Sequence, residues 1–197
     1  MPPPTGPGLR GKRATRSTLL ARRGALTERE RTEKSAAICA RAHDLLTTRL
    51  APGATVAVYA AKGSEVDPRP LDEALRASGF TVGYPRVPDD QRVLTFHAVT
   101  LADLVLARFG LREPLPHAPA IALDAIAAFV VPGLAFDRDG GRVGWGRGYY
   151  DATLTLAAGA LRAGLAFECQ LTERVPREAH DALLHEIITE AATYTVA

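Results

Sequence analysis

Two kinds of hydrophobic pattern alternate along this chain. Residues 27–49 open with the S/T-x-x-E pattern of a capping box and carry apolar residues on one face, which predicts a long amphipathic helix. Residues 55–59 and 127–131 are instead continuous apolar runs, typical of strands buried on both faces of a sheet. The same contrast extends over the rest of the chain. We expect further helices at residues 15–23, 68–78, 101–109 and 150–158, and strands at residues 80–84, 93–98, 163–167 and either 187–189 or 194–196.

Strands that alternate with helices predict a mostly parallel central sheet covered by helices on both faces. The expected fold class is α/β, a single three-layer domain over residues 12–197, because this length suits one hydrophobic core. Residues 1–11 hold four prolines and three glycines, which predicts a disordered tail. Gly79 and Gly110 are placed to end two helices, and Pro85 to end the strand before it.

Charge is unevenly distributed along the chain. The net charge is +2, but residues 1–34 carry nine Lys/Arg against three Glu. A basic segment of this kind can face nucleic acid or cover an anionic ligand. No aromatic residue accompanies it, which disfavours stacking on single-stranded nucleic acid, so nucleic acid is not the expected partner. A solvated helix surface is the simplest alternative.

The composition favours a cytoplasmic enzyme. Two cysteines are too few for a disulfide framework or a cysteine metal cluster. No apolar run has the length needed to span a membrane, and the N-terminus lacks the apolar segment of a signal peptide. We therefore expect a monomer in a reducing compartment, with no membrane partner.

The most informative segment lies between the apolar run at 127–131 and the predicted helix at 150–158. Residues 140–149 contain five glycines and two arginines, and Tyr150 and Asp151 follow them. Glycine marks backbone that must approach another group closely, and successive N–H groups with guanidinium groups suit a polyphosphate. The Asp151 carboxylate is suited to a magnesium ion on the same phosphates. A flexible surface loop is the alternative interpretation.

This segment does not match either common phosphate-binding pattern. The pattern G-x-x-x-x-G-K-[ST] is absent because no lysine follows these glycines, and G-x-G-x-x-G lacks its third glycine. The sequence therefore predicts a nucleotide loop of another kind. Ligands of α/β sheets bind beyond the carboxyl ends of the strands, which places the loops 60–67, 85–88 and 132–151 on one rim. We expect the following side chains to converge there: Glu65, Arg86, Arg142, Arg147 and Asp151.

With these segments in place, the chain resembles the 5-formyltetrahydrofolate cyclo-ligase family, also called 5,10-methenyltetrahydrofolate synthetase. The resemblance covers about residues 12–190. It is carried by Val131-Pro132-Gly133-Leu134-Ala135-Phe136-Asp137 and by Gly141-Arg142-Val143-Gly144-Trp145-Gly146-Arg147-Gly148-Tyr149-Tyr150-Asp151. Weaker support comes from Tyr84-Pro85-Arg86-Val87, Gly110-Leu111-Arg112-Glu113-Pro114 and Phe167-Glu168-Cys169-Gln170, with His180-Asp181 further on.

The resemblance implies an ATP-dependent reaction with Mg²⁺ as cofactor. The formyl oxygen of 5-formyltetrahydrofolate would attack the γ-phosphate of ATP, and N10 would then close on the activated carbon. The products would be 5,10-methenyltetrahydrofolate, ADP and phosphate. Positioning and charge neutralisation would supply most of the catalysis.

The resemblance also implies roles for individual residues. ATP contacts are implied at Lys12, Arg13, Arg16, Arg142, Val143, Gly144, Trp145, Gly146, Arg147, Gly148, Tyr149 and Tyr150. Substrate contacts are implied at Ala60, Glu65, Trp145, Gly146, Arg147, Gly148 and Tyr149. Catalytic roles fall to Arg147 and Tyr149, and magnesium ligands are implied at Asp151 and Asp181. Glu65 would bind the paired N–H donors of the pterin.

Several of these residues have a purely structural alternative. Asp181 would instead cap a helix around residues 182–184, Arg86 would pair with Asp89, and the two tyrosines would pack under the loop. Lys12 and Glu65 would be ordinary surface residues.

The chain also departs from the family pattern at three places. Trp145 stands where a Tyr, Phe or basic residue is expected, Val143 replaces leucine, and residues 60–64 lack bulky apolar side chains. Two other functions therefore remain open: a non-catalytic folate- or nucleotide-binding relative with an RNA-associated role, and a kinase-like activity on another formamide or carboxylate.

Overall fold

The computed structural model describes residues 7–196, with side chains from residue 16 onward. The helices are α1 (Pro7–Gly24), α2 (Glu28–Arg49), α3 (Arg69–Ala77) and α4 (Tyr149–Leu156). The strands are β1 (Thr55–Ala57), β2 (Thr81–Arg86), β3 (Thr95–His97), β4 (Val105–Leu106), β5 (Arg112–Glu113), β6 (Ala120–Ile121), β7 (Ile126–Val131), β8 (Ala135–Phe136), β9 (Arg142–Val143), β10 (Leu161–Leu165), β11 (Glu186–Ile188) and β12 (Thr193–Thr195). None of the helices that the structure describes is long and apolar enough to cross a membrane.

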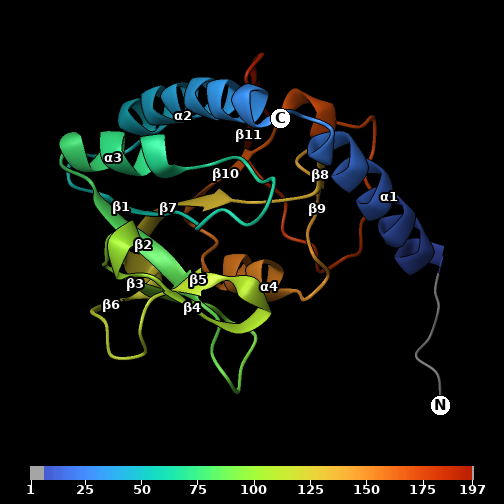
Figure 1. Cartoon of the computed structure of the whole chain (residues 1–197). Helices are drawn as coiled ribbons and strands as arrows, with labels where there is room; N and C mark the ends of the chain where they lie inside the picture. Colours follow the sequence, from blue (N-terminus) through green and yellow to red (C-terminus); the bar gives the residue numbers. More distant parts are fainter. Residues whose placement is uncertain (1–6, 197) are drawn as a thin grey trace.

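The centre of the molecule is an eight-stranded sheet with the order β12-β11-β10-β7-β1-β2-β3-β6. The strands from β11 to β2 are parallel, whereas β12 at one edge and β3 and β6 at the other are antiparallel. Helices α2 and α3 cover one face and α4 lies on the other (Figure 1). The predicted fold, a mostly parallel sheet between helical layers, is confirmed.

The sheet topology opens a crevice between β1 and β7. These strands are neighbours and run parallel, but the chain leaves them in opposite directions. After β1 it crosses through α3 to β2, and after β7 it crosses through α4 to β10. Ligand sites of such sheets form outside the carboxyl ends of strands at this point. The loops that follow β1 and β7 are therefore the walls of a candidate site.

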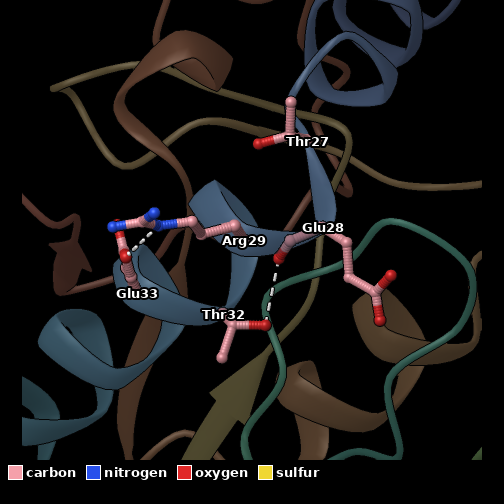
Figure 2. A pocket seen from close by; sticks show the side chains of 5 residues that line it. All are labelled: Thr27, Glu28, Arg29, Thr32 and Glu33. Carbon is pink, nitrogen blue, oxygen red and sulfur yellow. Dashed lines mark hydrogen bonds and ion pairs between the residues drawn. The ribbon is translucent and has the colours of Figure 1, made fainter.

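Helix α2 begins at the predicted capping box. The Thr27 hydroxyl accepts a hydrogen bond from the backbone N–H of Glu30, while the Glu30 carboxylate accepts one from the backbone N–H of Thr27. Figure 2 shows the first turns of the helix, where Thr32 donates to the Glu28 carbonyl and Arg29 pairs with Glu33. The reciprocal bonds between Thr27 and Glu30 satisfy two backbone donors that would otherwise lack a partner at the start of the helix.

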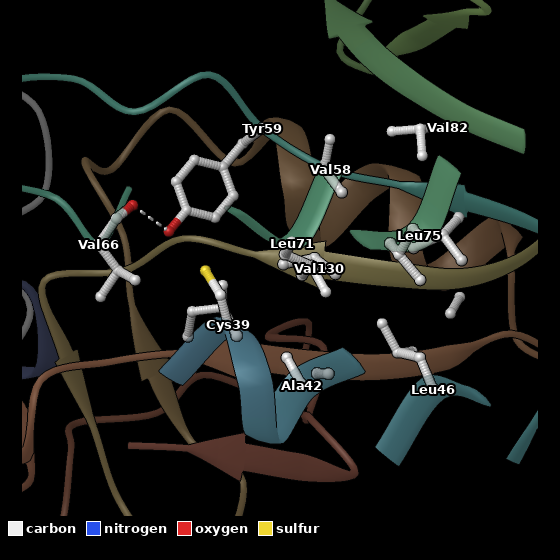
Figure 3. Close-up of a cluster of buried hydrophobic side chains, with 14 of the residues drawn as sticks. Cys39, Ala42, Leu46, Val58, Tyr59, Val66, Leu71, Leu75, Val82 and Val130 are labelled. Atoms are coloured by element: carbon white, nitrogen blue, oxygen red, sulfur yellow. Dashed lines mark hydrogen bonds between the residues drawn. The ribbon is translucent and has the colours of Figure 1, made fainter. Parts of the chain in front are cut away.

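Two hydrophobic clusters lie on opposite faces of the sheet because successive residues of a strand point to opposite faces. In β7, Ala128 and Val130 face the cluster under α2 and α3, whereas Phe129 and Val131 face the cluster around α4. In Figure 3, Ala42 and Leu46 of α2 lie beneath Leu71 and Leu75 of α3 and Val130 of β7. The continuous apolar run in β7 is thus explained by burial on both sides.

The predicted helix at residues 101–109 is wrong. The segment forms a short 3₁₀ turn (Leu101–Asp103), strand β4, a second turn (Arg108–Gly110) and strand β5, which pairs with β4. Leu106 is 78% exposed and Val105 is 41% exposed, so the segment has no buried helical face. Phe109 has a φ of 62°, in the left-handed region that a right-handed helix does not use.

Strand and helix ends also differ from the predictions. Pro85 does not end β2, because the pairing of β2 with β1 stops at Gly83 and β3 alone pairs with its last residues. Both alternatives for the last strand are correct, as β11 and β12. Helix α1 begins at Pro7 and includes residues 7–11 of the predicted tail. Residues 1–6 lie outside the described part of the chain.

Candidate active site

A cleft of about 710 Å³ lies at the carboxyl ends of β1 and β7. Its size falls in the range of sites for small molecules and cofactors. Six parts of the chain line it besides Arg16 of α1: the loop after β1, the end of β2 with its connection to β3, the β4–β5 hairpin, Pro132 directly after β7, the glycine-rich segment from Arg142 to Asp151, and the segment from Glu178 to Asp181. The rim predicted from the sheet topology is therefore a continuous cleft.

Helix α1 fixes the glycine-rich segment from one side. The Arg16 guanidinium donates from Nε to the Gly144 carbonyl over 2.8 Å. It also lies against Gly146, where an added Cβ would stand 2.7 Å from Nη2 and where φ is +89°. One helical turn further on, Leu19 packs in a small cluster with Val143. The positive φ at Gly146 favours glycine at this position.

Arg23 is a functional neighbour of the cleft that the sequence reasoning missed. Its side chain is fully buried and donates to the Ser64 hydroxyl and to the Gly133 carbonyl. It thereby connects the loop after β1 to the loop after β7. Arg16, Leu19 and Arg23 recur at steps of three and four residues and share one face of α1, which is the signal that could have identified it. Lys12 and Arg13 lie on the same helix, but their side chains are outside the described residues.

Arg142 and Asp151 form an ion pair at the start of α4. Arg142 is buried and donates from Nη2 to the Asp151 carboxylate over 2.8 Å. Gly148 precedes α4 with a φ of 73°. The helix begins at Tyr149, so Asp151 lies in its first turn, where the helix dipole stabilises a negative charge. The guanidinium carbon of Arg142 lies 5.7 Å from the ring centroid of Tyr150. Burial raises the pKa of the Tyr150 phenol.

The two tyrosines of the loop are both packed and accessible to the cleft. Tyr149 and Tyr150 contact the hydrophobic cluster around α4 and also line the cleft. Arg147 extends in the other direction, with its guanidinium 3.6 Å from the ring centroid of Phe109 on the β4–β5 hairpin. The glycine-rich segment thus contacts helix α1 at Gly144, the hydrophobic cluster around α4 through its tyrosines, and the β4–β5 hairpin through Arg147. The hairpin residues were missed because the sequence pattern predicted a helix in their place.

Glu65 lies at the other end of the cleft and is 8% exposed. Its carboxylate accepts hydrogen bonds from the Lys62 backbone N–H over 2.9 Å and from the Trp145 indole N–H over 3.2 Å. Burial raises the pKa of Glu65, and the hydrogen bonds from Lys62 and Trp145 and the charge of Arg23 oppose that shift. Ala60 lines the cleft beside this carboxylate, on the same loop. The Tyr59 hydroxyl donates to the Val66 carbonyl and closes the loop (Figure 3).

Arg86 does not join the other charged residues. It donates to the Pro114 carbonyl and lies 3.7 Å from the buried carboxylate of Glu113, outside the lining of the cleft. The alternative pairing with Asp89 is also wrong, because Asp89 pairs with Arg108. Glu113 itself lines the cleft, and burial raises its pKa. Of the five side chains expected on the rim, the structure brings Glu65, Arg142, Arg147 and Asp151 to the cleft.

Carboxylate oxygens for a cation are present on two sides of the cleft. Asp151 and Asp181 both line it, and the ligand atoms of Glu178, His180 and Asp181 lie within 4.8 Å of one another. Carboxylate oxygens suit the hard Mg²⁺ ion. Asp181 does not cap a helix, since residues 182–184 are not helical; it accepts a hydrogen bond from the backbone N–H of Glu178.

Comparison with known proteins shows to which family the chain belongs. A sequence model of the 5-formyltetrahydrofolate cyclo-ligase family matches residues 9–190, nearly the whole chain. The chain belongs to this family. The 5-formyltetrahydrofolate cyclo-ligase of Mycolicibacterium smegmatis is 32% identical over 186 residues, which cover 91% of this chain and 94% of the relative. That of Escherichia coli K12 is 31% identical over 147 residues, covering 71% of this chain and 80% of the relative.

Solved structures agree with the family assignment. The 5,10-methenyltetrahydrofolate synthetase of Aquifex aeolicus superposes with a TM-score of 0.79 at 29% identity, covering 94% of this chain and 92% of that one. The synthetase of Mycoplasma pneumoniae shares the fold, with a TM-score of 0.74 at 24% identity and coverage of 91% and 98%. The predicted enzyme class, a 5-formyltetrahydrofolate cyclo-ligase, is thereby confirmed.

Proposed function

We propose that this cyclo-ligase uses ATP and Mg²⁺ to convert 5-formyltetrahydrofolate into 5,10-methenyltetrahydrofolate in the cytoplasm, releasing ADP and phosphate. One observation carries the proposal. A single cleft holds a glycine-rich segment flanked by three arginines at one end and a buried carboxylate at the other. The first suits a triphosphate and the second suits the donor edge of a pterin. Both cysteines are free thiols, which is compatible with a reducing compartment.

The proposed reaction balances in two steps. The formyl oxygen attacks the γ-phosphorus, and the bond to the β-phosphate oxygen breaks to release ADP. N10 then attacks the formyl carbon and loses its proton, and the carbon–oxygen bond breaks so that phosphate leaves with the former formyl oxygen. The protein forms no covalent bond in either step, so it acts by holding the reactants in line and by stabilising charge.

The glycine-rich segment is the proposed triphosphate site. Its backbone N–H groups precede α4, and a helix N-terminus attracts anions. Arg16 is already fixed against Gly144 and Gly146, and Arg142 is buried beneath them. Arginines in place before the ligand arrives lower the cost of ordering on binding. Lys12 and Arg13 would extend this positive surface from the same helix.

Arg147 and Tyr149 are the proposed catalytic residues. Arg147 would neutralise the charge that develops as the γ-phosphoryl group transfers, the role for which a guanidinium is well suited. Tyr149 lines the cleft at the start of α4 and would orient the formyl group. Glu65 with Ala60 and residues 145–149 would bind the folate itself.

Asp151 and Asp181 are the proposed magnesium ligands. A bound Mg²⁺ would neutralise phosphate charge. Arg142 already holds the Asp151 carboxylate in a defined orientation, so this side chain is fixed before any ligand binds. Asp151 and Asp181 both line the cleft, and carboxylate oxygens are ligands that suit this ion.

The test is a spectroscopic assay with a matched pair of variants. Purified protein is mixed with 5-formyltetrahydrofolate and Mg-ATP, and the near-ultraviolet absorbance of the methenyl product is followed. We expect ATP-dependent growth of this band. Asp151→Asn should slow it on the order of a hundredfold or more while the fold is kept, because a charge-neutralising site of this kind is worth several kcal/mol. Asp90→Asn, an exposed change outside the cleft, should leave the rate unchanged.

The opposite results have clear meanings. A flat trace from folded protein that binds ATP would contradict the proposed reaction and would favour activity on another formamide or carboxylate. Turnover that survives in Asp151→Asn would leave the reaction in place and remove the proposed metal site.

A further inference from the structure

The contact between Trp145 and Glu65 bridges the two halves of the cleft. Trp145 belongs to the glycine-rich segment and Glu65 to the loop after β1, eighty positions apart in sequence. The indole N–H donates to Oε1 of Glu65, and the Lys62 ammonium lies 5.8 Å from the indole ring centroid. The side chain thus stands between the phosphate end and the folate end, in direct contact with the carboxylate proposed to bind the pterin.

Both oxygens of Glu65 already have a donor. Oε2 accepts from the Lys62 backbone N–H and Oε1 from Trp145. Because the residue is only 8% exposed, little of it is left for another ligand to reach. A pterin presents two parallel N–H donors, which bind best to the two oxygens of one carboxylate together. Each carboxylate oxygen has two acceptor sites, so the indole N–H takes one of the two on Oε1 and, because Glu65 is buried, restricts the approach of a pterin donor to that oxygen.

We propose that Trp145 is a gate at the folate end of the cleft, and that the substrate binds by displacing its indole from Glu65. This proposal rests on the proposed role of Glu65 in binding the pterin. A ligand with paired N–H donors replaces the hydrogen bond that Glu65 loses when the indole of Trp145 moves away. A ligand without such donors leaves the buried carboxylate without that hydrogen bond, and it therefore binds more weakly. The gate therefore also selects for the donor pattern of a pterin.

Trp145 is built to move while its backbone stays fixed. Trp145 is 51% exposed and stands between Gly144 and Gly146. Arg16 holds the carbonyl of Gly144 on the helix side, so displacement needs only a change of side-chain conformation. Such side-chain changes are common on binding even where the backbone hardly shifts.

The chain carries its own reporter of this movement, because Trp145 is its one tryptophan. Protein labelled with 5-fluorotryptophan gives one tryptophan ¹⁹F resonance. Titration with 5-formyltetrahydrofolate in the absence of ATP should shift that resonance toward its position in ligand-free Glu65→Ala, where the acceptor is gone. A resonance that keeps its position at saturation would overturn the gate.

Binding to Trp145→Phe supplies the second measurement. Phenylalanine keeps an aromatic ring but cannot donate to Glu65. We expect it to bind 5-formyltetrahydrofolate about tenfold to a hundredfold more tightly than the natural protein, the range of one hydrogen bond to a charged group. The comparison is made at mildly alkaline pH, so that Glu65 is ionised in both proteins. Unchanged or weaker binding would overturn the gate and assign Trp145 a role in holding Glu65 in place.

The same experiments separate this proposal from the proposed function. If the natural protein forms the methenyl product but Trp145→Phe binds no more tightly, the gate fails and the function stands. If the natural protein neither binds 5-formyltetrahydrofolate nor forms the product, the function fails and the gate fails with it.

Discussion

At the scale of single residues, Glu65 is the group whose protonation state matters most. Burial raises its pKa above the ordinary 4.5, so the carboxyl gains a proton at a higher pH than a solvent-exposed glutamate would. Only the ionised form accepts two N–H donors. The contribution of Glu65 to the free energy of unfolding depends on pH in the opposite direction. This contribution is present below the ordinary pKa and is lost as the pH rises through the raised pKa of the folded protein. Stability and substrate binding therefore respond to Glu65 in opposite directions.

We predict that the KM for 5-formyltetrahydrofolate rises as the pH falls through the raised pKa of Glu65. In Glu65→Gln the KM should be high and should lack this dependence, because the side chain no longer titrates. The measurement is KM and kcat against pH for both proteins. Glu113→Gln is the matched control, since Glu113 is a second buried glutamate of the cleft with a raised pKa. If the dependence vanished in Glu113→Gln and persisted in Glu65→Gln, the assignment of the pterin carboxylate would be wrong.

A second prediction concerns the contact between Arg147 and Phe109. The guanidinium packs 3.6 Å from the ring centroid, which holds Arg147 over the cleft from the opposite wall. Phe109→Leu keeps an apolar side chain but removes the ring. It should lower kcat about threefold to tenfold, the range of a partly exposed cation–π contact, and leave the free energy of unfolding nearly unchanged. Leu106→Ala, an exposed change on the same hairpin, should alter neither quantity. Equal kinetics for both variants would show that Phe109 does not position Arg147.

Sequence reasoning identified residues well where their chemistry was local. Asp151 and the arginines of the glycine-rich segment stand in one stretch of chain, and the structure places them together in the cleft. Arg23 and Phe109 were missed because their positions depend on distant segments: Arg23 contacts Gly133, one hundred and ten positions away. The spacing of Arg16, Leu19 and Arg23 places them on one face of α1, but it does not show which distant loops that face contacts.

At the scale of secondary structure, local signals explain the success with α2. Its start follows from the reciprocal hydrogen bonds between Thr27 and Glu30, and its buried face from Ile38, Ala42 and Leu46. The β4–β5 hairpin was mispredicted because its apolar residues are not spaced for burial: Leu104 is buried while Leu106 is exposed. The hairpin instead serves the cleft, to which it contributes residues from Phe109 to Glu113.

The cap of α2 can be tested by itself. Thr27→Ala removes the hydroxyl that accepts from Glu30 and should lower the free energy of unfolding by about 1 kcal/mol. Urea denaturation measures the change. Thr48→Ala is a suitable control, because this hydroxyl donates to the Asp44 carbonyl within the helix, away from its start. Since the cap lies outside the cleft lining, turnover at low temperature should be the same in all three proteins. A loss equal to that of the control would contradict the role of the capping box.

At the scale of the whole molecule, topology explains why the site lies where it does. The alternation of strands and helices predicted a parallel sheet. Because ligands of such sheets bind beyond the carboxyl ends of the strands, the sequence also predicted which loops would surround the site. What the alternation does not encode is strand order: the neighbours β1 and β7 are separated by about seventy positions. Their adjacency brings Glu65 from one loop to Trp145 from the other. The antiparallel pairing at both edges was not predicted either.

The central claim is that this one cleft transfers the γ-phosphoryl group of ATP to the formyl oxygen of the folate. Labelling that oxygen with oxygen-18 tests it most directly. The substrate is turned over with Mg-ATP in ordinary water, and the released phosphate is analysed by mass spectrometry. We predict one labelled oxygen in each phosphate and one phosphate for each methenyl product. Unlabelled phosphate, with the label lost to water, would contradict phosphorylation of the formyl oxygen and with it the proposed mechanism.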